Sequence, residues 1–99
     1  MDKMSGMRRH LPSTQALACF EAAARHESYT RAAQELALTQ SAVSRQILAL
    51  EDQLGVQLVF RGSRFQGLTP EGQRVLDWAR RIVGDIRALK DEMRKVHTG

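Results

Sequence analysis

The strongest constraint on the fold of this 99-residue chain is a regular spacing of apolar residues near its C-terminus. From position 75 onward, apolar residues recur at alternating intervals of four and three positions. Three heptads of this kind lie along one side of a long helix, forming a seam that a second helix normally covers. The chain has few other elements to cover it, so we predict a homodimer. The seam comprises Val75, Ala79, Ile82, Ile86, Leu89, Met93 and Val96.

The same long helix, expected over about 70–96, has a clear start and further apolar positions. The letters TPE at 69–71 give an N-cap, a proline at the first helical position and an acid in the first turn. Leu76 and Val83 widen the apolar stripe, and we expect them to pack back on the rest of the chain. Trp78 is expected to anchor the helix where it leaves the body. Packing of the seam within a single chain remains the alternative to a dimer.

Three shorter helices precede the long one, each with a hydroxyl residue at its expected start. Ser13, then Ser28 or Thr30, and then Thr39 can each accept a hydrogen bond from a free amide in the first helical turn. Apolar residues follow each of them at helical spacing. We expect the helices to end near residues 26 and 37 and at Gly55, which can adopt the left-handed conformation common at helix ends.

The segment between Gly55 and the long helix is rich in β-forming residues. Residues 56–60 contain two valines and a phenylalanine, residues 61–64 (RGSR) are typical of a turn, and residues 65–68 can return as a second strand. The chain is therefore expected to be mainly α with a small β-hairpin.

Composition narrows the class of protein. The single cysteine, Cys19, cannot form an internal disulfide, which favours a reducing compartment. No apolar run approaches the roughly 18 residues of a membrane span, and no apolar segment of a signal peptide follows the N-terminus. We therefore expect a cytoplasmic protein with no membrane contact. The formal net charge of +4 weakly favours an anionic partner.

A tight turn at residues 37–39 separates the second and third helices, which is typical of a helix-turn-helix. Ala33 is small enough for a close crossing of the two helices, and Ala37 stands where glycine is often found. Val43 and Ile47 can fill the shared core. Three ordinary packed helices without a ligand remain the alternative.

The outward face of the third helix favours DNA binding. Ser41, Ser44 and Arg45 point away from its apolar stripe, and small polar groups let a helix approach the bases closely in a groove. Gln40 can hydrogen-bond to adenine, and Arg45 can reach guanine or a phosphate. Because phosphate repels carboxylates, the scarcity of acids here is more informative than the net charge.

Two arginines lie in the acid-free stretch from Gln53 to Pro70. Arg64, at the tip of the expected hairpin, can enter a narrow minor groove, although a solvated turn residue is the alternative. Arg61 has two roles open to it, contact with DNA or pairing with a carboxylate such as Glu51.

A combined motif extends from about residue 11 to the long helix. It comprises FEAAARH at 20–26, SYTRAA at 28–33, Leu36, TQSAVSRQI at 39–47, LE at 50–51, LG at 54–55, Leu58, Arg61, Arg64, LT at 68–69 and Gly72. This motif resembles the N-terminal DNA-binding domain of LysR-type transcriptional regulators. The residues from 11 to 26 look most like the branch of glycine-cleavage activators and β-lactamase regulators.

The resemblance implies a winged helix-turn-helix followed by a linker helix that pairs in an antiparallel homodimer on promoter DNA. It implies major-groove roles for Gln40, Ser41, Ser44 and Arg45, and a minor-groove role for Arg64 in the wing. Thr30 and Arg31 would lie near phosphate. Val59 and Gln66 depart from the family pattern, which typically has Phe and an aliphatic residue at these positions.

Length adds one more expectation. Members of this family continue into a domain that binds a small-molecule effector, and the full-length protein can assemble into a tetramer. We therefore expect a flexible tail over 1–12, a winged helix-turn-helix over 13–69 and a linker helix over 70–96, with the effector-binding domain absent.

The sequence does not favour an enzyme. His10, His26, His97 and Cys19 are scattered without ligand spacing, and no glycine-rich phosphate loop is present. We expect no metal, no cofactor and no catalytic residue. A protein-interaction adaptor that acts only through the heptad helix is the remaining alternative.

Overall fold

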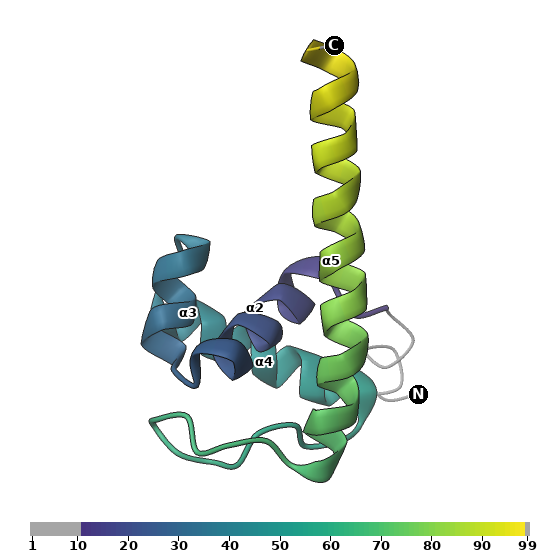
Figure 1. The fold of residues 1–99 in the computed structure, drawn as a ribbon. Coiled ribbons are helices and arrows are strands. Elements are labelled where there is room, and N and C mark those ends of the chain that lie inside the picture. The colour runs from purple at the N-terminus through teal and green to yellow at the C-terminus, as the bar shows by residue number, and fades with distance from the viewer. Residues whose placement is uncertain (1–10, 99) are drawn as a thin grey trace, which may run out of the picture.

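The computed structural model describes residues 11–98, which form a body of three short helices and one long helix that extends beyond it (Figure 1). The flexible tail expected over 1–12 lies outside the described residues except for its last two positions. Within residues 11–98, no helix has the length and apolarity to cross a membrane. The helices are α2 (Thr14–His26), α3 (Tyr29–Leu36), α4 (Gln40–Leu54) and α5 (Pro70–Thr98).

The expected helix starts are confirmed by side-chain capping bonds. Ser13 Oγ accepts a hydrogen bond from the Ala16 amide at 3.0 Å. Ser28, rather than Thr30, caps α3, and Thr39 and Thr69 cap α4 and α5 in the same way. Each bond satisfies an amide that has no partner within the helix, so the starts are fixed locally.

The first three helices end on residues in the left-handed conformation. Gly55 adopts it after α4 with φ 75°, as expected. Ala37 after α3 (φ 57°) and Glu27 after α2 (φ 52°) adopt it with a side chain present. Non-glycine residues rarely take this conformation because Cβ crowds the backbone. The two connections that orient α3 therefore each contain a strained position.

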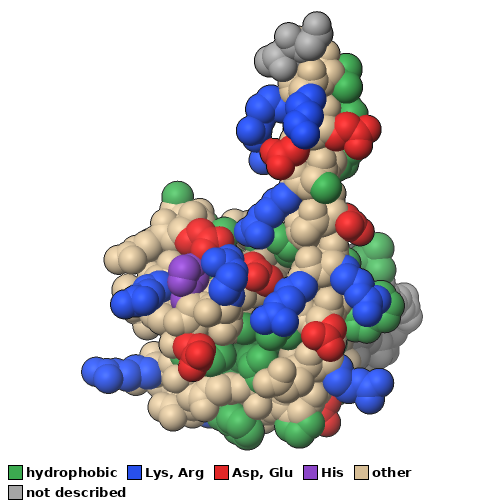
Figure 2. Space-filling view, in the orientation of Figure 1, with side chains coloured by type: hydrophobic (Ala, Val, Ile, Leu, Met, Phe, Trp, Pro, Cys, Tyr) green, Lys and Arg blue, Asp and Glu red, His purple; other side chains and the backbone are tan. Residues whose placement is uncertain are grey.

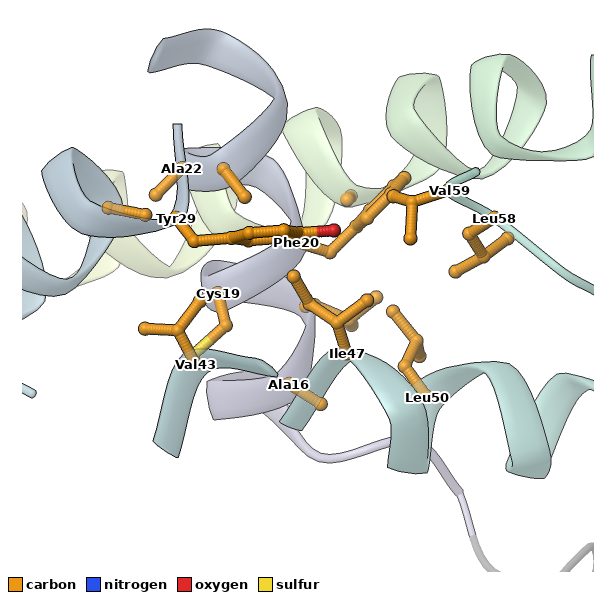
Figure 3. Packing of buried hydrophobic residues seen from close by; sticks show 14 of the residues in the cluster. Ala16, Cys19, Phe20, Ala22, Tyr29, Val43, Ile47, Leu50, Leu58 and Val59 are labelled. Atoms are coloured by element: carbon orange, nitrogen blue, oxygen red, sulfur yellow. The ribbon is translucent and has the colours of Figure 1, made fainter. Parts of the chain in front are cut away.

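The core lies where α2 packs against the other three helices (Figure 3). Phe20 of α2 is fully buried among apolar side chains of α4 such as Ile47 and Leu50. Cys19 is also buried, and burial raises the pKa of its thiol. Leu58 and Val59, which follow α4 in the chain, are also buried in this core.

The expected β-hairpin is not confirmed. The chain does reverse direction between α4 and α5, but within residues 55–69, here called the α4–α5 loop, pairing is limited to one isolated antiparallel bridge between Val59 and Leu68. A regular ladder needs the amides of the first arm to donate to the second. The amide of Leu58, which would face the second arm, donates to the carboxylate of Glu51 instead, and the amide of Val59 donates to the same carboxylate.

The long helix α5 divides its apolar residues between two environments. Leu76 and Val83 pack into the core as expected. Ala79, predicted to face a partner, is 0% exposed within the single chain, so that prediction is wrong because α2 already covers this part of the seam. Trp78 is 61% exposed and does not anchor the helix. Its indole lies under the Arg81 guanidinium, 5.0 Å from the ring centroid.

Candidate nucleic-acid interface

The turn between α3 and α4 is held by backbone hydrogen bonds. The amide of Leu38 donates to the Ala33 carbonyl at 2.9 Å, and Ala37 donates to Gln34. This pattern closes a helix that ends on a left-handed residue. Ala33 is buried at the crossing of α3 and α4, where a larger side chain would separate the two helices. The helix-turn-helix expected from the sequence is therefore present.

The first two turns of α4 present a polar, acid-free surface. Gln40, Ser41 and Arg45 are exposed, as the sequence analysis predicted. Ser44 is half-buried and lines a hollow of about 260 Å³ between α4 and the α4–α5 loop. The outward surface at the start of α4 is therefore made by the other three side chains, and Ser44 lies toward the loop.

The starts of α3 and α4 meet through a side-chain contact. Thr30 Oγ1 donates a hydrogen bond to Gln40 Oε1 at 3.2 Å. The contact orients the Gln40 amide and joins two residues that were predicted to contact different parts of DNA. Arg31 is exposed beside Thr30 in the first turn of α3. Helix N-termini carry unpaired amides and a partial positive charge, so this corner suits an anion.

The tip of the α4–α5 loop approaches the same corner. A hollow of about 390 Å³ is lined by Thr30 and Gln40 on one side and by Ser63 and Arg64 on the other. An edge-to-face contact holds the loop here, because the rings of Tyr29 and Phe65 lie 5.7 Å apart at 75°. The predicted residues Thr30, Gln40 and Arg64 are thus brought together, although they are far apart in sequence.

Glu27 was not predicted to belong to this region. It lines the same hollow as Gln40 and Arg64, and it is exposed. The sequence carried little signal for it, because the acid lies between two helices at a residue that ends α2 with positive φ. A carboxylate there opposes the approach of phosphate.

Arg61 pairs with Glu51, which is one of the two roles that the sequence left open. Arg61 Nη2 donates to Glu51 Oε1 at 2.5 Å. The carboxylate is 6% exposed and the guanidinium side chain is 57% exposed. One nitrogen of Arg61 is therefore committed to the protein interior, while most of its side chain faces solvent.

A cluster of charges ties α3 to α2 and to α5. Arg25 donates to Glu21 and to both oxygens of Glu35. The hydrogen bonds from Arg25 lower the pKa of the Glu35 carboxyl to about 2, with a smaller contribution from His26 and against the opposing effect of burial. Arg87 of α5 lies 3.6 Å from Glu35. The cluster thus pairs two acids near the helix-turn-helix, Glu21 and Glu35, with basic side chains.

Basic side chains continue along α5 on the face seen in Figure 2, and green apolar side chains follow one edge of its free end. Among the described residues, no group of three His, Cys, Asp or Glu side chains is arranged to hold a metal ion.

Residues 14–73 match the family model described as "Bacterial regulatory helix-turn-helix protein, lysR family". The chain belongs to this family. The match confirms the resemblance inferred from the motif at 20–72, and it covers α2, α3, α4, the α4–α5 loop and only the start of α5.

Curated relatives within the family are named as regulators of transcription. The chain is 45% identical over 94 residues to the HTH-type transcriptional activator AmpR of Providencia stuartii, covering 95% of this chain and 32% of the relative. It is 57% identical over 67 residues to the glycine cleavage system transcriptional activator of Escherichia coli, covering 68% of this chain and 22% of the relative. The chain thus spans about a third or less of these relatives.

Solved structures of the family share the fold. The BenM DNA-binding domain in complex with catB site 1 DNA is 33% identical, covers 88% of this chain and 97% of its own, and has a TM-score of 0.76. An OxyR mutant of Corynebacterium glutamicum is 28% identical over 87% of this chain and 27% of its own, with a TM-score of 0.83.

Proposed function

We propose that this chain binds duplex DNA in a sequence-specific manner, with α4 in the major groove. The observation that carries the proposal is the exposed, acid-free surface made by Gln40, Ser41 and Arg45 at the start of α4. Short polar side chains allow the helix to approach the base edges, and Gln and Arg have the donor geometry for adenine and guanine. DNA complexes of family members, such as that of the BenM DNA-binding domain, support the same assignment.

The α4–α5 loop acts as the wing, and Arg64 at its tip reaches the adjacent minor groove. Exposed arginine is favoured in narrow, A·T-rich grooves, where the potential is most negative. Thr30 and Arg31 contact the phosphates between the two grooves, at the start of α3. Ser44 supports the approach of α4 from its half-buried position rather than reading a base.

The chain acts as a homodimer through the exposed half of α5, and it forms the DNA-binding part of a transcription regulator. Ile82, Ile86, Leu89 and Met93 form the dimer surface, and the core-facing Val75 and Ala79 play no direct part in it. The chain spans about a third or less of these relatives, and the effector site and tetramer implied by the family resemblance would belong to the full-length protein. The adaptor alternative is not favoured, because the family match lies mainly outside α5.

The test of this function is a titration of the chain with duplex DNA at several salt concentrations. Because bound phosphates release counterions, affinity should fall steeply as salt rises. Sequences selected from a random duplex pool supply the preferred site, and its half-site spacing reports the dimer geometry. Absence of binding to promoter-length duplexes at low salt overturns the proposal.

Two arginine variants separate base reading from phosphate contact. Arg45→Ala should weaken binding to the selected site by about 1–3 kcal/mol and bind unrelated DNA nearly as before. Arg31→Ala, which removes the same charge from α3, should weaken binding equally on all duplexes and reduce the salt slope by about one. An equal loss on all sequences for Arg45→Ala would assign that residue to the phosphate backbone.

A further inference from the structure

The α4–α5 loop lacks the ladder that normally fixes the direction of a wing. Between its two arms, backbone hydrogen bonds run from Phe60 to the Gly67 carbonyl (3.1 Å) and from Thr69 to the Leu58 carbonyl (3.0 Å). Within the described loop no strand forms around them. Two bonds leave a ribbon of this length free to twist about its base. The position of the loop tip relative to α4 must therefore depend on contacts between the loop and the rest of the fold.

The carboxylate of Glu51 provides that connection. Its Oε2 accepts hydrogen bonds from the backbone amides of Leu58 (2.8 Å) and Val59 (3.2 Å). Its Oε1 accepts a hydrogen bond from Arg61. A single side chain in the last turn of α4 thus holds the first arm of the loop at three residues.

A carboxylate suits this position for a specific chemical reason. Each of the three groups that face Glu51 is a donor, and an ionised carboxylate is the side chain that accepts at both oxygens. A glutamine would turn an NH₂ group toward either a backbone amide or a guanidinium, leaving a donor against a donor. Because Glu51 is nearly enclosed, a lost acceptor there is not replaced by water without opening the loop.

The three hydrogen bonds to Glu51, here called the clamp, connect α4 to the α4–α5 loop. Both elements meet DNA in the function proposed above. Arg45 is carried by α4 itself, and Arg64 lies three residues beyond the clamped Arg61. The Tyr29–Phe65 contact supports the loop beyond its tip, and Glu51 supports it before the tip. The reach from the major-groove helix to the minor-groove arginine is therefore set through Glu51.

We infer that Glu51 is a positioning residue for the wing, selecting the flanking base step that Arg64 reads. This inference rests on the DNA-binding function proposed above. A purely structural role of Glu51 would change two properties together, the discrimination at the flanking positions and the sequence preference read by α4. Loss of the clamp should remove discrimination at the flanking positions, while the sequence preference read by α4 should persist.

The experiment compares two charge-equivalent variants, Glu51→Gln and Asp52→Asn. Asp52 is the next residue on α4, and within the described loop the hydrogen bonds from this part of α4 are those of Glu51, so the Asp52 variant controls for the removal of one negative charge near DNA. Each protein is titrated with the selected duplex and with a duplex in which the flanking A·T pairs are changed to G·C. Wild type and Asp52→Asn should prefer the A·T flanks, and in Glu51→Gln this preference should fall by about fivefold or more.

A cycle with Arg64→Ala tests whether Glu51 acts through the wing arginine. Arg64→Ala should reduce the A·T preference in wild type and have little further effect in Glu51→Gln, because the two changes remove one contact. Hydrogen exchange should show faster exchange of the Leu58 and Val59 amides in Glu51→Gln. If that variant does not fold, Arg61→Gln removes the hydrogen bond to Glu51 Oε1 and leaves those from the Leu58 and Val59 amides, so the A·T preference should fall by a smaller factor while the preference read by α4 persists.

The outcomes are distinguishable. Absence of DNA binding by the wild-type chain overturns the proposed function and this inference with it. DNA binding with an unchanged flanking preference in folded Glu51→Gln, or with additive effects of Glu51→Gln and Arg64→Ala, overturns the inference alone. Binding by wild type with no flanking preference also overturns it.

Discussion

The two halves of α5 share one apolar spacing but have different surroundings. In the first half, Leu76, Ala79 and Val83 are buried against the body of the same chain. In the second half, the same spacing continues with side chains in solvent, and Leu89 is 57% exposed. The spacing of apolar residues along α5 stays the same where their burial ends. It simply extends beyond the body that covers it (Figure 1).

The difference shows what a heptad spacing can establish. It identifies a helix face that must be covered, but it does not identify the element that covers it. The first half finds its cover in α2, and the second half has no cover within the described chain. The dimer proposed above is thus supported by the second half alone.

The largest expected effect is a difference in stability between two leucine substitutions, one in each half of α5. Leu76→Ala should lower the free energy of unfolding by about 2–5 kcal/mol, because it leaves a cavity in the core. Leu89→Ala should leave the stability of the monomer within about 0.5 kcal/mol of wild type, since its side chain is exposed there. Urea denaturation at concentrations low enough to keep the chain monomeric measures both. Equal losses in the two variants would contradict the division of α5.

The second prediction concerns association rather than folding. Ile86→Asp should weaken dimerisation by about 2 kcal/mol or more, because a carboxylate would be desolvated in the seam. Ala88→Asp adds the same charge on α5 away from the seam and serves as the matched control. Sedimentation at several concentrations measures the monomer–dimer equilibrium. A dimer unchanged in Ile86→Asp would show that the free half of α5 is not the dimer surface.

The sequence predicted the helices well because their boundaries depend on local chemistry. Caps such as Ser13 and Thr39 bond to amides three residues away, and Gly55 ends α4 through its own backbone. The exposure of Gln40, Ser41 and Arg45 was predicted for a similar reason, since the period of one helix places all three away from its apolar stripe.

The features that were missed depend on contacts between elements. Glu51 reaches amides seven and eight residues away, and the first of these bonds takes the Leu58 amide from the expected hairpin ladder. Glu35 meets Arg25 across two helices. Ala79 was assigned to a partner because spacing alone does not reveal that α2 lies over it. No local pattern distinguishes these arrangements, which only the packing of the whole chain determines.

The third prediction concerns how stability depends on pH through Glu35 of α3, which lies 3.6 Å from Arg87 of α5. The pKa of Glu35 is lowered from 4.5 to about 2, chiefly by hydrogen bonds from Arg25. A depressed carboxyl pKa stabilises the fold above pH 4.5, and this stability is lost as pH falls from there toward 2. We expect a loss of about 1 kcal/mol, since solvent screens a partly exposed group. Thermal unfolding across this range measures it.

Glu35→Gln should abolish that part of the acid dependence. Arg87→Gln, which removes the contact from the free half of α5, should keep most of it, because Arg25 and His26 make the hydrogen bonds to Glu35. A loss of the acid dependence in Arg87→Gln would instead mean that the outer half of α5 is fastened to the body through Glu35.

The smallest effect is expected at Gly84, directly after the last buried position of α5. A Cβ there meets no atom within 4 Å, so Gly84→Ala should stabilise the helix by up to about 1 kcal/mol. Gly72→Ala is the matched change in the covered half, where a Cβ would overlap the Leu58 carbonyl oxygen, and it should destabilise the fold. Denaturation of both variants as monomers gives the sign of each effect. Because Gly84 lies on the side of α5 opposite the seam, Gly84→Ala should leave dimerisation unchanged, and a weakened dimer would contradict the assignment of the seam.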